Sequence, residues 1–121
     1  MVEPEGQRLP GTARIRRGDD IRTVLRRGIR SRTPTLDVYI LRVPSRPQPR
    51  VGWVVPKLGN GSVARNRLKR RLREIGRKRV LGALSARGVG VDVLVRVRTS
   101  AYRATYHQLE EELMSVVDGK W

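Results

Sequence analysis

Residues 65–74, with the sequence R-N-R-L-K-R-R-L-R-E, are the stretch that decides the fold. Leu68, Leu72 and Ile75 recur at i, i+4 and i+7, which is the spacing of one face of an α-helix. Nine of the 15 residues from 65 to 79 are Arg or Lys. The stretch therefore predicts a helix with one narrow buried face and a basic surface on its other sides.

The charged side of this helix has the spacing of a phosphate-binding surface. At about 100° per residue, Arg65, Lys69 and Arg73 form one ridge, and Asn66 and Arg70 lie on the next. Like charges at i, i+4 cost about a few tenths of a kcal/mol per pair, and a bound anion relieves that cost. Asn66 adds a donor and an acceptor that can read a base edge or a ribose hydroxyl. We predict that the residues in contact with nucleic acid are Arg65, Asn66, Arg67, Lys69, Arg70 and Arg73.

Strand patterns lie on both sides of the basic helix. Residues 35–43 (T-L-D-V-Y-I-L-R-V) are rich in β-branched residues, with Leu36 and Tyr39 on opposite faces, and residues 51–55 (V-G-W-V-V) form a second strand. A loop with three prolines separates the two, which predicts an antiparallel hairpin. After the helix, residues 91–97 (V-D-V-L-V-R-V) form a third strand.

Two further helices complete the pattern. Asp19 can cap a short basic helix that ends at Gly28, and Thr105 with Gln108 forms a capping box for a last helix. Residues 82–90 are predicted to break the structure between the basic helix and the third strand. The order helix, strand, strand, helix, strand, helix contains one hairpin and one crossover, which predicts an α+β fold with a mixed sheet.

Length and charge limit what such a fold can do. The 121 residues suffice for one domain, which we place at residues 13–118, after a flexible lead-in at residues 1–12. The 27 Lys and Arg and 11 Asp and Glu give a net charge of +16, so the expected partner is a polyanion, nucleic acid ahead of an anionic membrane. No apolar run approaches the roughly 18 residues of a membrane span and no signal peptide is visible, so we expect a soluble protein of the cytoplasm.

The sequence offers no catalytic or metal-binding constellation. The absence of cysteine excludes a disulfide scaffold, a thiolate zinc site and a cysteine nucleophile. The single histidine, His107, is expected at the surface rather than as a general base. The five acids between Arg14 and Arg103 are scattered, whereas a two-metal nuclease site needs several that converge. We therefore predict no catalytic residue and no metal ligand.

Four segments of the chain follow the pattern of a known family. The run R-N-R-x-K-R-x-x-R-E at residues 65–74 is the hallmark of that family, and residues 51–63 match the strand and turn that precede it. Residues 20–28 and 92–98 match two further motifs, upstream and downstream. In these segments, and over residues 14 to 117 as a whole, the chain resembles the bacterial ribonuclease P protein subunit.

The resemblance implies a small subunit that joins a catalytic RNA and helps to remove the 5′ leader from precursor tRNA. The RNA then performs the hydrolysis, with magnesium held mainly by the RNA and the substrate, and the protein is the accessory subunit of an endoribonuclease. The implied fold is a two-layer α-β-β-β-α-β-α sandwich with a left-handed strand-helix-strand crossover, although crossovers are ordinarily right-handed. The implied partners are the catalytic RNA and precursor tRNA, with no membrane and no DNA.

The resemblance also implies a cleft for the single-stranded leader, between the first helix and the sheet. The residues that map onto this cleft are Arg14, Ile21, Leu25, Tyr39 and Lys57. The family often has Phe on the first helix and this chain has none, so Tyr39 is the expected platform for base stacking. Pro56 stands where the family commonly has Ser, which removes a hydroxyl and a backbone N–H from the cleft.

Other classes of protein would show similar charge. A ribosomal or assembly protein could bind structured RNA without a part in cleavage, and this is the alternative, although the ordered run at residues 65–74 argues against it. A DNA-binding module could place a basic helix in the major groove, but this helix lies between strands and no dimerisation heptad is present. Membrane binding is less favoured, because the apolar side of the helix has neither Trp nor Phe.

Overall fold

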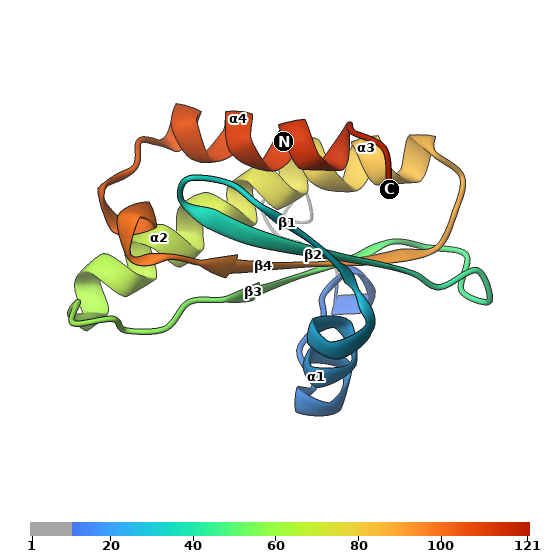
Figure 1. Ribbon diagram of the computed structural model, residues 1–121, viewed down its shortest axis with the longest axis horizontal. Coiled ribbons are helices and arrows are strands. Elements are labelled where there is room, and N and C mark those ends of the chain that lie inside the picture. The colour runs from blue at the N-terminus through green and yellow to red at the C-terminus, as the bar shows by residue number, and fades with distance from the viewer. Residues whose placement is uncertain (1–10) are drawn as a thin grey trace, which may run out of the picture.

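The computed structural model describes residues 11–121 of the chain (Figure 1). Its helices are α1 (Gly18–Arg27), α2 (Ser62–Ile75), α3 (Leu81–Ala86) and α4 (Tyr106–Val117), and its strands are β1 (Ile29–Arg32), β2 (Leu36–Arg42), β3 (Arg50–Val54) and β4 (Val91–Val97). Short 3-10 segments lie at Gly11–Ala13 and Thr99–Arg103. Of the predicted lead-in at residues 1–12, only the last two residues are described, and they belong to the first 3-10 segment. Within residues 11–121 no helix is long and apolar enough to cross a membrane.

The sheet has four strands in the order β1-β2-β4-β3. β4 therefore lies between β2 and β3, antiparallel to the first and parallel to the second. The predicted hairpin between residues 35–43 and 51–55 is wrong. The physical reason is burial, because every residue of β4 except Arg96 is buried, and a strand of that kind needs a partner on each side.

β1 is a strand that the sequence pattern does not predict. It pairs antiparallel with β2, Ile29 opposite Ile40, and forms the edge of the sheet. Its residues I-R-S-R are mostly exposed, so no apolar alternation marks them as a strand. With β1 included and α2 and α3 taken as one helical stretch, the order is α-β-β-β-α-β-α, and the α+β class with a mixed sheet is confirmed.

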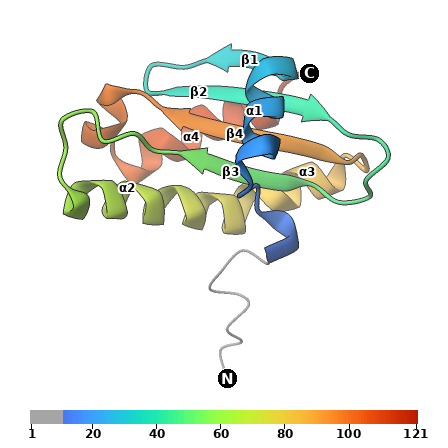
Figure 2. The same ribbon diagram turned by 90° about the horizontal axis from the view of Figure 1, so that it is seen from below.

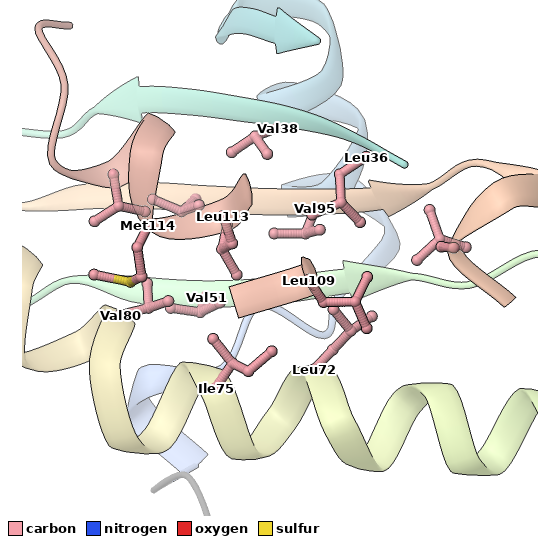
Figure 3. Packing of buried hydrophobic residues seen from close by; sticks show 14 of the residues in the cluster. Leu36, Val38, Val51, Leu72, Ile75, Val80, Val95, Leu109, Leu113 and Met114 are labelled. Carbon is pink, nitrogen blue, oxygen red and sulfur yellow. The ribbon is translucent and has the colours of Figure 1, made fainter. Parts of the chain in front are cut away.

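The two faces of the sheet are covered unequally (Figures 1 and 2). α2, α3 and α4 lie on one face, and the main core forms between them and the sheet (Figure 3). The core residues labelled there are Leu36, Val38, Val51, Leu72, Ile75, Val80, Val95, Leu109, Leu113 and Met114. α1 covers the other face, over a smaller cluster of Ile15, Val24, Tyr39 and Leu94. The two-layer sandwich thus describes the main core, and α1 adds a helix on the opposite side.

The crossover from β3 through α2 to β4 is left-handed, as the resemblance implies. Figure 2 views the sheet from the α1 side, where β3 runs to the left, α2 and α3 return to the right behind the sheet, and β4 runs to the left again above β3. The great majority of parallel connections have the opposite hand. As a result of this crossover, α2 lies along the β3 edge of the sheet (Figure 2).

The basic helix is longer than its apolar pattern predicts. α2 continues through a π-helical turn, Gly76–Val80, directly into α3. The N–H of Leu81 donates to the carbonyl of Gly76, and this i→i+5 bond inserts one residue, which rotates the following side chains by about 100°. Val80 and Leu84 thereby return to the buried face, both 0% exposed. The predicted break at residues 82–90 begins only after Ala86.

The ends of α1 and α4 show which predicted caps form. The N–H of Gln108 donates to Thr105 Oγ1 at 3.0 Å, which confirms the cap of α4. α1 starts at Gly18 with Arg17 as its N-cap, two residues earlier than predicted, and Asp19 pairs with Arg22 instead of capping the helix. Gly28 ends α1 as predicted, with an extended backbone, and a side chain is disfavoured there because its Cβ would lie 2.6 Å from the Val24 carbonyl oxygen.

Glu112 on α4 ties the β1–β2 turn to the helical layer. Its Oε1 accepts hydrogen bonds from Thr33 Oγ1 at 2.6 Å, Thr35 Oγ1 at 2.7 Å and the Thr35 N–H at 3.0 Å. Its Oε2 accepts from Gln108 Nε2 at 3.0 Å. Burial raises the pKa of Glu112, but the hydrogen bonds from Thr33, Thr35 and Gln108 together outweigh burial, and the net pKa is lowered. The fold therefore favours the ionised carboxylate.

Replacing Glu112 by glutamine should make the stability of the fold less sensitive to acid. Because the pKa of Glu112 is lower in the folded chain, its carboxylate stabilises the fold above the unfolded pKa, and that contribution disappears as the pH falls through the folded pKa. We expect Glu112→Gln to cost about 1–2 kcal/mol at about pH 7 and much less at about pH 3. Urea unfolding at the two pH values measures this, and equal losses at both would show that the charge is not the cause.

Candidate nucleic-acid interface

Some cations of the basic helix are already bound to other parts of the chain. Arg65 and Arg71 donate to backbone carbonyls on either side of the helix, Arg65 Nε at 2.7 Å and Arg71 Nη1 at 3.2 Å. Lys78 and Arg79 pair with carboxylates at 3.0 Å and 3.3 Å. These four side chains have part of their charge or hydrogen-bonding capacity satisfied within the fold.

The remaining polar side chains of the helix form a free face. Within the described part of the chain, no hydrogen bond or ion pair is made by the side chains of Asn66, Arg67, Lys69, Arg70, Arg73 and Arg77. Lys69 and Arg77 are half-buried and the other four are exposed. Five of the six predicted RNA contacts belong to this free face, which carries positive charge without an internal partner. The sixth predicted contact is Arg65.

Arg65 joins the basic helix to the loop that carries Lys57. Its Nε donates to the Val55 carbonyl, and Tyr102 Oη donates to the Pro56 carbonyl at 2.6 Å, so two consecutive carbonyls are held. The side chain of Arg65 is half-buried, unlike those of its exposed neighbours. The structure thus gives Arg65 a positioning role in the loop before α2.

A hollow of about 260 Å³, here called the β3-edge hollow, lies between the basic helix and the N-terminal segment. Its lining residues are Arg14, Ile15, Arg16, Ile21, Val51, Trp53, Lys69 and Arg73. The N-terminal segment runs parallel to β3, with the Ile15 N–H donating to the Val51 carbonyl at 3.0 Å. Gly52 permits this approach, because a Cβ there would lie 2.8 Å from Ile15 Cβ. The hollow brings two predicted leader residues, Arg14 and Ile21, together with two predicted RNA contacts, Lys69 and Arg73.

Tyr39 lies beneath α1. It belongs to the buried cluster of the α1 face, against which Ile21 and Leu25 pack. Its exposed fraction is 9%, so its ring is covered and has no free face for a base. In this structure β2 directs the ring of Tyr39 into the second core, so its role as a stacking platform for the leader stays a prediction.

Lys57 stands apart from the other predicted leader residues, on an exposed turn between β3 and α2. The turn has positive φ angles at Leu58 (49°) and Gly59 (82°). Its neighbours Pro56 and Leu58 line a second hollow of about 570 Å³, together with Arg96 of β4. Arg14, Ile21, Leu25, Tyr39 and Lys57 thus occupy three adjoining regions instead of one cleft.

Several residues that line these hollows are missing from the sequence-based set, among them Arg96, Trp53 and Arg16. Arg96 is the single exposed residue of β4, and it is also the single cation in V-D-V-L-V-R-V, a signal that could have found it. Trp53 is half-buried, and its indole Nε1 is buried without a hydrogen-bond partner among the residues described. Arg16 stands in a run of arginines, and nothing in the sequence separates it from its neighbours.

A network of ion pairs joins α1 to the sheet. Asp92, 3% exposed at the start of β4, accepts from Arg50 Nε at 3.0 Å and Arg50 Nη2 at 2.9 Å, and it also pairs with Arg46. Arg50 Nη1 reaches Asp20 of α1 at 3.3 Å. The hydrogen bonds and charges of Asp92 and Asp20 raise the pKa of Arg50, against the opposing effect of burial. Arg50 therefore links β3, β4 and the first helix.

Acidic and histidine side chains do not gather into a metal site. Among residues 11–121, no group of three or more His, Asp and Glu could hold an ion, so the donors of this part of the chain do not fit a magnesium site. His107 is exposed, as predicted, and lies 3.3 Å from Glu111.

The mixed sheet, the long basic helix and the cation-lined hollows give an α+β protein with the features typical of nucleic-acid binding. Comparison with known proteins supplies the family. The family model described as Ribonuclease P matches residues 9–119. The chain belongs to the ribonuclease P protein family, whose members are components of a tRNA-processing ribonucleoprotein.

Curated relatives and solved structures agree with this membership. The ribonuclease P protein component of Beutenbergia cavernae is 39% identical over 105 residues, covering 87% of this chain and 85% of that protein. That of Streptomyces bikiniensis is 39% identical over 113 residues, covering 87% and 89%. The structure of the RNase P protein of Staphylococcus aureus superposes with a TM-score of 0.72 at 24% identity, and the match covers 88% of this chain and 93% of that protein. The structure of the RNase P protein of Thermotoga maritima also superposes with a TM-score of 0.72 at 24% identity, and the match covers 86% of this chain and 94% of that protein. At that identity the two structures support the fold.

Proposed function

We propose that the chain binds the catalytic RNA of ribonuclease P in the cytoplasm, through the free face of α2, and so assists removal of the 5′ leader from precursor tRNA. The observation that carries the proposal is the set of five predicted contacts that have no hydrogen-bond or ion-pair partner within residues 11–121, Asn66, Arg67, Lys69, Arg70 and Arg73. Arg binds phosphate bidentately, and an uncompensated row of cations favours a polyanionic backbone. Family membership supports RNA as that polyanion.

The leader of precursor tRNA is proposed to pass along the β3-edge hollow and across the end of the sheet. Arg14 contributes a cation and Ile21 an apolar wall at the hollow, and Lys57 and Arg96 contribute cations beyond it. Because Tyr39 is covered, contact with the leader is expected to depend on charge and apolar packing more than on base stacking. Lys69 and Arg73 belong to both the hollow and α2, so the two RNAs would meet there.

Magnesium is proposed to be held mainly by the RNA and the substrate. The described donors do not fit a magnesium site, and no step is assigned to an ion bound by this chain. The protein instead contributes its net charge of +16, which lowers the repulsion between two phosphate backbones. This contribution should matter most where few other cations screen the RNA.

The test is cleavage of precursor tRNA by a bacterial ribonuclease P RNA, with and without the purified protein. We expect the protein to raise the cleavage rate at low magnesium, where the RNA alone is slow, and to have no cleavage activity by itself. Cleavage by the protein alone, free of contaminating RNA, would contradict the proposal. Preferential recovery of ribosomal RNA by the protein from cells would favour the alternative of an RNA-binding protein without a part in cleavage.

A further inference from the structure

A third hollow, of about 280 Å³, lies between α2 and the segment that leads into α4. We call it the arginine hollow, after the three guanidinium groups in its wall. Its lining residues are Ala64, Arg67, Leu68, Arg71, Tyr102, Arg103, Ala104 and Thr105. No Asp or Glu is among them, so the charge of this lining is +3, from Arg67, Arg71 and Arg103.

The arginine hollow lies on the other side of α2 from the β3-edge hollow. Arg67 and Arg71 line the first, whereas Lys69 and Arg73 line the second. Residues two positions apart on an α-helix point about 160° away from each other. One RNA segment bound at Lys69 and Arg73 would therefore not also fill the arginine hollow, and the two sites are separate.

The polar groups of the arginine hollow leave guanidinium donors free. Arg71 Nη1 donates to the Ala104 carbonyl at 3.2 Å, which fixes one wall. Tyr102 Oη and Thr105 Oγ1 are already used, the first by the Pro56 carbonyl and the second by a backbone N–H of α4. Arg67 and Arg103 are exposed and make no hydrogen bond or ion pair within residues 11–121.

The acids of the neighbouring helices are already paired with other cations. Glu74 of α2 pairs with Lys78 at 3.0 Å, and Glu110 of α4 pairs with Arg79 at 3.3 Å. Glu111 lies 3.3 Å from the imidazole of His107. The arginine hollow is therefore concave and has no carboxylate in its lining. One of its guanidinium groups, that of Arg71, is fixed by a hydrogen bond, and those of Arg67 and Arg103 make no hydrogen bond or ion pair within residues 11–121.

We propose that the arginine hollow is a second phosphate site, which binds the backbone of another segment of the same catalytic RNA. The proposal rests on the proposed function and adds that α2 lies between two RNA segments. Guanidinium groups in a concave wall suit the tetrahedral oxygens of a phosphodiester, with which each can form paired hydrogen bonds. A polyanion with many adjacent phosphates is the ligand that can reach both sides of one helix.

The test is hydroxyl-radical footprinting of the catalytic RNA, together with the salt dependence of binding. The double variant Arg67→Ala/Arg103→Ala removes the free guanidiniums and keeps Arg71, whose hydrogen bond supports the fold. We expect it to lose one protected RNA segment and to lower the slope of log K against log salt by about 1.4–1.8. Arg70→Ala/Arg73→Ala should lose a different segment. Lys120→Ala removes an exposed charge next to the last residue of the chain and should change neither.

The outcomes separate this proposal from the proposed function. An unchanged footprint and slope for Arg67→Ala/Arg103→Ala, or loss of only the segment that Arg70→Ala/Arg73→Ala also loses, would overturn the second site. If wild-type protein protects no segment, the proposed function itself fails. Thermal unfolding of the variants at the wild-type temperature would show that a lost footprint does not come from a lost fold.

Discussion

Replacing Lys69, Arg70 and Arg73 together by alanine should weaken binding to the catalytic RNA roughly 100-fold at about 0.15 M salt. Each lost phosphate contact lowers the slope of log K against log salt by about 0.7–0.9, so the triple variant should lose about 2–3 in slope. None of the three side chains has a partner among residues 11–121, and two of them also line the β3-edge hollow. Equilibrium binding over a series of salt concentrations measures both quantities.

A charge-matched control removes three cations that this account keeps away from the RNA. Lys78 and Arg79 are paired with carboxylates, and Lys120 lies near the end of the chain. Their triple alanine variant should lose less than about 1 in slope. The binding variant should unfold no earlier than wild type, because it removes the like charges of Lys69 and Arg73 at i, i+4. Equal slopes for the two triple variants would show that binding depends on the net charge of the protein and not on the position of these cations.

Asp92→Asn should destabilise the fold by about 2–4 kcal/mol. Removal of one partner from a buried ion pair is costly because it leaves the other charge without compensation. Here Arg46 loses its carboxylate, and Arg50 keeps only its contact with Asp20. The effect should lie toward the lower part of the range for buried pairs, because the two arginine side chains are 20% and 28% exposed. Urea unfolding at neutral pH gives the free energy.

Asp37→Asn is the matched control for Asp92→Asn. Asp37 pairs with a single arginine, Arg30, at 3.2 Å, and the side chains of Arg30 and Asp37 are 50% and 14% exposed. Such exposed pairs contribute about 0–1 kcal/mol. If both variants lower the free energy of unfolding by the same amount, the ion pairs of Asp92 do not connect β4, Arg50 and α1 as the structure indicates.

The sequence predicts the elements in which apolar residues recur with a constant period, and it does not predict those in which that period changes. Leu68, Leu72 and Ile75 are 0–2% exposed, as their spacing predicts. Val80 and Leu84 are equally buried, but the π-helical turn shifts their phase, so a constant period of 3.6 residues places them off the core face. The helix therefore continues where the pattern predicts a break.

Sheet pairing could not be predicted from neighbouring strands. β2 and β3 follow each other along the chain, but the buried strand β4 enters between them, which requires contacts across a long crossover. β1 is missing from the prediction because Arg30 and Arg32 give an exposed edge strand the composition of a loop. The left-handed crossover follows from the family resemblance and not from any local pattern.

The binding site is predicted well on the helix and less well on the sheet. Helical spacing separates the free face of α2 from its buried stripe, although it cannot show that Arg65 turns back to the Val55 carbonyl. On β2, alternation places Tyr39 on the face opposite Leu36, which is correct. That face is covered by α1, a contact between separate elements that alternation cannot reveal.

The most direct measurement uses the absence of cysteine from the chain. A photo-crosslinker attached at Asn66→Cys lies on the free face of α2, and one at Ser115→Cys lies on the exposed surface of α4. In the complex of protein, catalytic RNA and precursor tRNA, we expect position 66 to crosslink to the catalytic RNA and position 115 to crosslink to neither RNA. Crosslinks from position 66 to precursor tRNA alone, or equal crosslinking from both positions, would contradict the claim that the free face of α2 binds the catalytic RNA.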